Sequence, residues 1–308
     1  MTTSYQHTLR HSISCTGVGL HSGARVSMTI NPAPANTGIT FVREDLPRGE
    51  GTVAARYQNV VDTDYNTSIG NKGGARIATV EHLLAALSGC GIDNAVVEID
   101  GPEVPAMDGS AGPFVFLIEC AGVESQDALR RVIRILKTVE VRKGGRSARL
   151  SPADTFTIGF EIGYDNPVIG TQAYQVKPLN GAFKTELCQA RTYGFAHEVE
   201  AMRAQGLARG GSLDNAVVIS DDRVLNAEGL RFADEFVRHK ILDAMGDLYL
   251  AGGPMLGRYD GIRAGHAFNH ALLSALFADK GAWRLETAEA PAPEFEHRWE
   301  GAPAVATA

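Results

Sequence analysis

Short runs that alternate between hydrophobic and polar residues predict strands in both halves of the chain. Longer runs with helical spacing lie between them, so we expect an α+β fold. The predicted strands are residues 25–30, 94–99, 132–141 and 155–162. The predicted helices are residues 79–87, 110–121, 231–251 and 266–277, with Thr79 as N-cap of the first and Pro113 in the first turn of the second.

A polar stretch at residues 124–131 separates two such series of elements, and the strand-like pattern restarts after it. We therefore expect two domains of similar size, residues 1–128 and 129–285. From Glu289 onward the chain is rich in Ala, Pro and Glu, which predicts a loose tail over residues 286–308.

The segment 231–251 differs from an ordinary surface helix, because it has apolar residues on two opposite faces. This pattern predicts a helix buried between two layers. Polar side chains within such a helix need hydrogen-bond partners or a metal, because burying them unpaired is costly. One face contains Phe232, Phe236, His239, Asp243, Asp247 and Leu250, and the other contains Val237, Ile241, Ala244, Met245 and Leu248.

Two pairs with a spacing of four residues are candidates for metal binding. His239 and Asp243 lie one turn apart, so both side chains reach a common point, and imidazole and carboxylate are good Zn²⁺ donors. A His–Asp hydrogen bond in a core explains the same spacing. His266 and His270 form a rival pair, and spacing alone does not choose between the two.

A third candidate is Glu81-His82 in the helix at residues 79–87. On a metal-site interpretation His82 binds the ion and Glu81 accepts a proton from water, a division of roles found in zinc hydrolases. On the alternative interpretation an exposed or capping Glu precedes a half-buried His. The chain contains no HExxH, GxxxxGK[ST] or GxSxG motif, so zinc peptidases, P-loop proteins and nucleophile-elbow hydrolases are unsupported.

Composition narrows the function classes further. The chain has 308 residues, 44% of them hydrophobic, and a net charge of −7, which argues against a general nucleic-acid binder but not against one local anion site. We expect no membrane span, because no run of about 20 residues is apolar, and no secretion signal, because residues 1–10 are polar. The scattered cysteines predict reduced, mostly buried thiols in a cytoplasmic enzyme or binding protein: Cys15, Cys90, Cys120 and Cys188.

Several motifs taken together resemble one known family. The sequence is similar to the zinc-dependent UDP-3-O-acyl-N-acetylglucosamine deacetylases, which perform the committed step of lipid A synthesis in Gram-negative bacteria. The resemblance covers about residues 4–280. The matching segments are TGVGLHSG at 16–23, TVEHLLAAL at 79–87, MDGSAGPF at 107–114, RTYGF at 191–195, LARGGSLDNAVV at 207–218, DEFVRHKILDAMGDL at 234–248 and Gly265-His266.

The resemblance implies two sheet-and-helix domains packed face to face, with the helices sandwiched between the sheets. It implies that His82, His239 and Asp243 bind Zn²⁺ and leave one position open. Glu81 would be the general base. His266, rather than His270, would face the reaction centre, with Asp247 favouring its protonated form and Thr192 helping to stabilise the oxyanion.

The resemblance also implies a reaction, the release of acetate from an acylated UDP-sugar. Either His266 or Glu81 would protonate the leaving amine. Lys240 and Arg263 are candidates for the diphosphate, and four residues of the segment 191–218 are candidates for an acyl passage, with ordinary core as the alternative. These four are Phe195, Ser212, Ala216 and Val218.

Two rival functions stay open at the level of sequence. One is a hydrolase acting on another N-acyl sugar with the same metal chemistry. The other is a sugar-nucleotide binding protein whose zinc is structural or absent. We further expect a monomer, with a small-molecule substrate, no nucleic-acid partner and no transmembrane segment.

Overall fold

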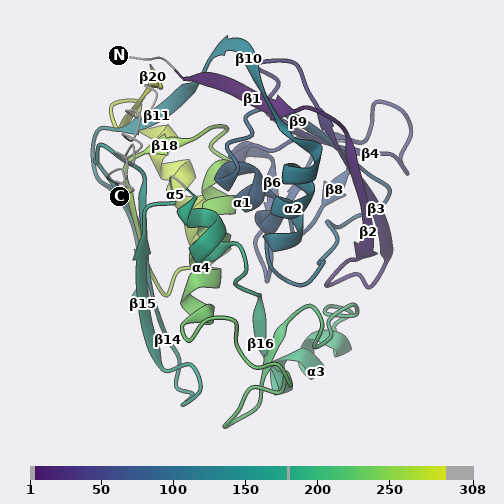
Figure 1. Cartoon of the computed structure of the whole chain (residues 1–308). Helices are drawn as coiled ribbons and strands as arrows, with labels where there is room; N and C mark the ends of the chain where they lie inside the picture. The colour runs from purple at the N-terminus through teal and green to yellow at the C-terminus, as the bar shows by residue number, and fades with distance from the viewer. Residues whose placement is uncertain (1–3, 179–180, 289–308) are drawn as a thin grey trace, which may run out of the picture.

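Two five-stranded sheets enclose four helices in the computed structural model, which describes residues 4–178 and 181–288 (Figure 1). The sheets lie on opposite sides of the molecule, with α1, α2, α4 and α5 between them. The expected α+β class and the sandwich of helices between sheets are confirmed. Most of the predicted tail, residues 289–308, lies outside the described residues.

The first sheet and its helices come from the N-terminal half. Neighbouring strands are antiparallel except β4 and β9, which are parallel. In spatial order the strands are β2 (Ile13–Val18), β3 (Arg25–Pro32), β9 (Ala95–Ile99), β4 (Ile39–Arg43) and β5 (Thr52–Ala54). The helices are α1 (Glu81–Gly89) and α2 (Gly112–Ala121).

The second sheet repeats this topology, since β14 and β19 again form the one parallel pair. Because the chain has no visible sequence repeat, the sequence did not predict this symmetry. We propose that the two halves divide near residue 128. The strands are β12 (Val139–Lys143), β13 (Arg146–Ser151), β19 (Arg258–Ile262), β14 (Thr157–Gly163) and β15 (Thr171–Val176), and the helices are α4 (Glu235–Tyr249) and α5 (His266–Ala278).

Shorter elements connect the halves or extend from them. Two strand ladders connect segments distant in sequence: β1 (Tyr5–Leu9) with β10 (Val123–Leu129), and β11 (Arg131–Ile135) with β18 (Met255–Leu256) and β20 (Trp283–Thr287). Each half also has an insert that precedes, in sequence, the final strand of its sheet, which is β9 in the first half and β19 in the second. The inserts contain β6 (Val60–Asp62), β7 (Ser68–Gly70) and β8 (Arg76–Ile77) in the first half, and β16 (Tyr193–Phe195), α3 (Ala196–Ala204) and β17 (Val217–Ile219) in the second.

Three sequence predictions are wrong in detail. Residues 132–141 form two strands in different sheets, because the chain bends at Lys137 between them. Thr79 does not cap α1, since its hydroxyl donates to Glu103 instead (2.9 Å). The long helix begins at Glu235 rather than at residue 231.

The structure also tests the expectations of buried cysteines and of no membrane-spanning helix. All four cysteines are free, but Cys120 is exposed, and Cys15 and Cys90 are only half-buried, so the expectation of mostly buried thiols is wrong. Cys188 alone is buried. Within the described ranges, no helix combines the length and apolarity needed to cross a membrane.

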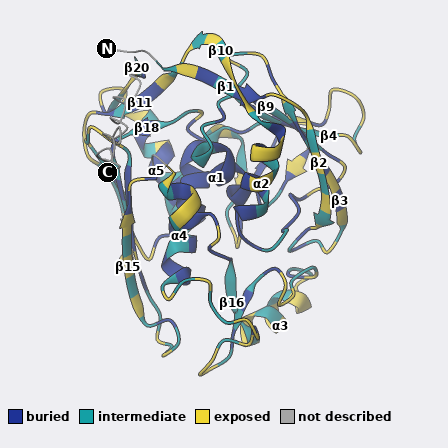
Figure 2. Cartoon of the chain, viewed as in Figure 1, coloured by how far each residue is buried: buried dark blue, intermediate teal, exposed yellow. Residues whose placement is uncertain are grey.

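The buried helices α1 and α4 pack closely against each other (Figure 2). Their approach depends on Gly246, where an added Cβ would lie 2.0 Å from the backbone oxygen of Glu81. A glycine within a helix costs about 1 kcal/mol relative to alanine. Here the missing side chain lets the first turn of α1 rest directly on α4.

The Gly246→Ala variant is therefore expected to lose stability, although alanine is the better helix former. A contact of 2.0 Å with backbone forces the helices apart, and overpacking of this kind costs about 1–3 kcal/mol. Denaturant unfolding measures the change. A Gly246→Ala protein at least as stable as the wild type would contradict the close approach.

Candidate functional site

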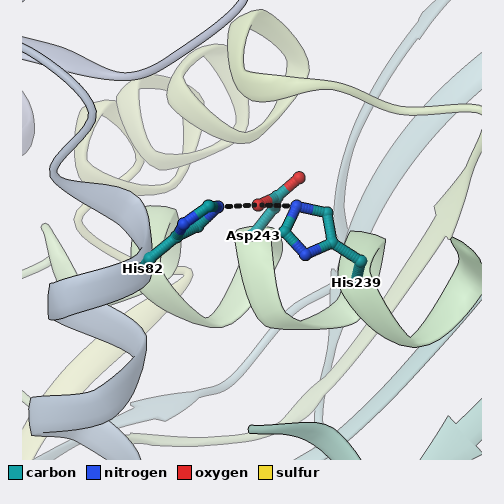
Figure 3. Close-up of side chains that lie close together, drawn as sticks. All are labelled: His82, His239 and Asp243. Carbon is teal, nitrogen blue, oxygen red and sulfur yellow. Dashed lines mark ion pairs between the residues drawn. The ribbon is translucent and has the colours of Figure 1, made fainter. Parts of the chain in front are cut away.

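Three buried side chains from two helices converge where α1 crosses α4. His82 comes from α1, and His239 and Asp243 come from successive turns of α4 (Figure 3). Asp243 Oδ1 lies 3.4 Å from His82 Nε2 and 3.2 Å from His239 Nε2. One ligand atom from each residue lies within 4.8 Å of the other two. The structure thus brings together the three residues that the resemblance assigns to the metal.

Neighbouring groups orient these ligand atoms. The Nδ1 of His239 lies 3.0 Å from the backbone oxygen of Ala190. Since a carbonyl only accepts, Nδ1 carries the proton and Nε2 presents its lone pair toward Asp243. Asp243 Oδ2 accepts from Lys240 Nζ (2.8 Å), whereas the buried Oδ1 has no hydrogen-bond partner in the described structure.

A divalent cation fits this arrangement. Two imidazole nitrogens and an unpartnered carboxylate oxygen face one another in a buried space, and an uncompensated group of that kind is costly. Burial lowers the pKa of His82, which keeps its ring neutral. Burial opposes the charge on Asp243, but the ammonium group of Lys240 holds its pKa well below the usual value. Neutral imidazole and ionised carboxylate are the forms that bind metals.

Glu81 and His266 lie beside the three ligands. The Nε2 of His266 lies 3.9 Å from Glu81 Oε1, and its Nδ1 lies 2.8 Å from Asp247 Oδ2. Glu81 Oε2 accepts from the backbone N–H of Thr67 (3.0 Å). The Thr67 hydroxyl in turn donates to Asp247 Oδ1 (2.6 Å), so one residue steadies both carboxylates.

The environment shifts the pKa values of Glu81 and His266 upward. Burial raises the pKa of Glu81 to about 8, against the attraction of His266. Burial opposes the charge on His266, but the attraction and hydrogen bond of Asp247 outweigh it and raise the pKa to about 9. His266 is therefore a cation at neutral pH, as the sequence comparison with the family implied.

The three ligands, Glu81 and His266 line one cavity of about 260 Å³, which Thr192 also lines. His266 lies in the wall of this cavity, whereas His270, one turn further along α5, is not among its lining residues. His21, which no sequence pattern indicated as a site residue, lies in the wall with both ring nitrogens buried and unpartnered among the described residues. The same holds for the position of Tyr65, Tyr164, Tyr193 and Glu198 in the wall, which no pattern indicated either.

Arg191 holds Thr192 and Ala190 in place, a role that no sequence pattern indicated. Its side chain is 2% exposed and donates to Glu235 at the start of α4 (2.9 Å) and to Glu228 (2.7 Å). Ala190 and Thr192, its neighbours in the chain, contact His239 and line the cavity, respectively. One buried ion pair thus fixes the segment that orients a ligand and supplies a wall.

Two further pockets adjoin the central cavity. A pocket of about 410 Å³ is cationic, with Lys240, Arg263 and Arg146 in its walls, and it shares Tyr164 and Lys240 with the cavity. A separate pocket of about 320 Å³ is mostly apolar and shares five residues with the cavity: Leu20, His21, Thr192, Tyr193 and Gly194.

The predicted substrate residues divide between these pockets. Lys240 and Arg263 share the cationic pocket, and Ser212, Ala216 and Val218 share the apolar one. Phe195 lines the central cavity instead of the apolar pocket, packing 5.7 Å from the Tyr164 ring. The strand β16 directs it there, one residue before α3 begins.

Comparisons with known proteins all point to one family. The profile of the family described as UDP-3-O-acyl N-acetylglycosamine deacetylase matches residues 6–278. A protein named UDP-3-O-acyl-N-acetylglucosamine deacetylase from Phenylobacterium zucineum is 51% identical over 92% of this chain and 97% of its own length. Proteins of that name from Acidithiobacillus ferrooxidans (52%, over 94% of this chain and 95% of its own) and Stenotrophomonas maltophilia (50%, over 93% and 95%) are similarly close.

Proposed function

Because the chain belongs to the UDP-3-O-acyl N-acetylglycosamine deacetylase family, we propose that it hydrolyses the N-acetyl amide of UDP-3-O-acyl-N-acetylglucosamine. The products are acetate and the free amine, in the committed step of lipid A biosynthesis. The convergence of His82, His239 and Asp243 beside Glu81 and His266 is the observation that carries this proposal.

We propose Zn²⁺ as the cofactor, held by His82 Nε2, His239 Nε2 and Asp243 Oδ1. Two nitrogens and one oxygen are a common ligand set of catalytic zinc sites, in which the remaining position takes water or substrate. When bound, the ion supplies Lewis-acid chemistry, polarising the amide carbonyl and making water more acidic. All other steps belong to side chains of the protein.

Glu81 acts as the general base. Its Oε1 faces the cavity, while Oε2 is occupied by the Thr67 N–H, so the carboxylate presents one free oxygen in a fixed direction. That oxygen accepts the proton of the attacking water. Burial disfavours the charged form of Glu81, and this strengthens it as a base.

His266 stabilises the negative charge that develops on the amide oxygen, together with Thr192, which lines the same cavity. Asp247 holds the ring through Nδ1, which leaves the Nε2 proton directed into the cavity. A preorganised donor of this kind lowers the free energy of the transition state by roughly 3–4 kcal/mol. The leaving amine then takes a proton from His266 Nε2 or from Glu81 Oε1, the two acids within reach.

The three pockets correspond to the three parts of the substrate. The central cavity takes the sugar and its acetamide, the cationic pocket takes the diphosphate, and the apolar pocket takes the acyl chain. Lys240 lines both the central and cationic pockets and bonds to Asp243, so diphosphate binding lies next to the metal ligands.

Acetate release tests the substrate assignment. We expect turnover of the acylated UDP-sugar to exceed that of its non-acylated counterpart and of acylated sugars without UDP. Equal rates with N-acetyl sugars that lack both groups would favour the rival hydrolase. A complete absence of acetate release, with sugar nucleotide still bound, would favour a binding protein.

Filling the apolar pocket tests its role separately. We expect Ala216→Phe to lower kcat/KM for the acylated substrate at least about tenfold, because buried apolar contacts of about 1–3 kcal/mol are lost. The rate with the non-acylated sugar nucleotide should stay unchanged. Leu225→Phe, at an exposed position outside the pocket, is the matched control. Equal losses for both substrates would remove the acyl chain from this pocket.

We also propose that the enzyme works as a monomer in the cytoplasm. All the proposed ligands and catalytic groups come from one chain, so a partner is not needed to complete the site. Four unpaired cysteines are typical of proteins in a reducing compartment.

A further inference from the structure

A second large cavity lies at the far ends of α4 and α5 from the reaction centre. Its volume is about 630 Å³, and it shares no lining residue with the three pockets of the proposed active site. Gly252 and Gly253, just beyond the end of α4, form one wall. Trp283 and Leu285 of β20 and the last turn of α5 form another. The proposed substrate occupies the other three pockets and leaves this cavity without an assigned ligand.

Arg56 extends its guanidinium into this cavity through a gap between two glycines. A Cβ at Gly252 would lie 1.3 Å from Arg56 Nη1, and a Cβ at Gly38 would lie 3.3 Å from Nη2. Both glycines have positive φ angles (94° and 70°), so both the conformation and the space favour glycine. The fold therefore holds the cationic group at a defined place.

The cavity has positive charges without matching acids. In the described structure neither Arg56 nor Arg131, which also lines it, forms an ion pair or a side-chain hydrogen bond with another residue. Asp93, the one carboxylate among the described lining residues, is already bound by Arg130 (2.8 Å) and by the backbone N–H of His7 (2.9 Å). In a chain with a net charge of −7, this is a local site for an anion.

Aromatic rings line the same cavity. Tyr57 and Phe277 stack with centroids 4.7 Å apart, and Trp283 meets Phe277 edge to face at 4.9 Å. Fixed guanidinium groups bind phosphate in a bidentate manner, and aromatic side chains bind planar bases. A small-molecule site combines such an apolar surface with few convergent polar groups.

We propose that this cavity binds a nucleoside phosphate, with its phosphate on Arg56 and Arg131 and its base against the cluster of Tyr57, Phe277 and Trp283. An alternative is that Arg56 only compensates the partial negative charge at the C-terminal end of α4. The chain at this point does lie against that end, since the N–H of the adjacent Tyr57 donates to the backbone oxygen of Leu250 (2.8 Å). That alternative predicts a loss of stability on Arg56 replacement, without any ligand affinity to lose.

The chain contains only two tryptophans, and this makes the site directly observable. Trp299→Phe leaves Trp283 as the single indole, in the wall of the cavity. Titrating this protein with ADP should quench the Trp283 fluorescence in a saturable manner. Arg56→Ala and Arg131→Ala should each weaken binding roughly tenfold or more, because each removes a charged hydrogen-bond donor. Arg131 is exposed, so its replacement tests the site even if Arg56→Ala does not fold.

Two controls separate this site from others. Arg142→Ala removes an exposed arginine of β12 outside the cavity, and Lys240→Met removes a cation of the proposed diphosphate pocket. Neither should change the ADP affinity. ADP should bind at least roughly tenfold more tightly than adenosine or pyrophosphate alone. An unsaturable signal, equal affinity in Arg131→Ala, or pyrophosphate binding as tightly as ADP would each overturn the proposal.

Discussion

The Glu81→Gln variant is expected to lose about 10²- to 10⁴-fold in kcat while still binding close to one metal ion per chain. Glutamine keeps the shape of the side chain and the acceptor for the Thr67 N–H, but it cannot take a proton from water. The His82, His239 and Asp243 ligands are unchanged. Initial rates of acetate release and the metal content of the same sample measure both effects.

The position of Glu81 next to a ligand makes this test specific. Glu81 and His82 are consecutive residues of α1, so a general distortion would disturb both the base and the ligand. Loss of the metal together with activity would therefore make Glu81 a structural residue or a ligand. Glu81→Asp serves as a companion, since it retains a carboxylate but withdraws it from the cavity, and we expect its rate to fall between those of Glu81→Gln and the wild type.

The His266→Gln variant is expected to lose about 10²- to 10³-fold in kcat, the usual effect of removing an oxyanion donor. Its metal content should stay close to that of the wild type and the chain should still fold, although the unfolding midpoint should fall because the buried Asp247 loses its cationic partner. Asp247→Asn should have a similar but smaller effect, since it weakens the cationic form of His266 without removing the ring. Unchanged kcat in His266→Gln would remove this residue from the reaction.

The pH dependence gives a second readout of the same residue. The pKa of His266 is about 9 in the folded protein against an ordinary 6.5, so the cation persists at neutral pH. Activity that depends on the cation should fall as the pH rises through about 9, and this limb should be absent from His266→Gln. Because the folded pKa is the higher one, the stabilisation from the Asp247 pair is complete below pH 6.5 and disappears as the pH rises through about 9.

The sequence predicted the helices of the site well, because their apolar periodicity reflects burial. The two-sided pattern of residues 231–251 anticipated a helix between layers, and α4 occupies that position. The prediction failed at the helix starts, where tertiary contacts decide. Thr79 turns its hydroxyl to Glu103, and Glu235 is fixed by Arg191, so the chain before each helix follows side-chain partners instead of local capping preference.

The convergence of the ligands could not be derived from residue spacing. His82 and His239 are 157 positions apart, and the place where their helices meet depends on the missing side chain of Gly246. Spacing also left His266 and His270 as a rival pair, until the position of α5 beside Asp247 separated them. The resemblance to the family supplied the assignment that composition and periodicity left open.

Metal content measured together with deacetylation tests the central claim most directly. We predict close to one Zn²⁺ per chain in the active protein, loss of acetate release after chelation, and recovery when zinc is restored. His239→Ala should abolish both tight binding and recovery, while His270→Ala, at the rival position one turn beyond His266, should retain them. A chelated, metal-free protein with full turnover, or a fully loaded and active His239→Ala variant, would contradict the account.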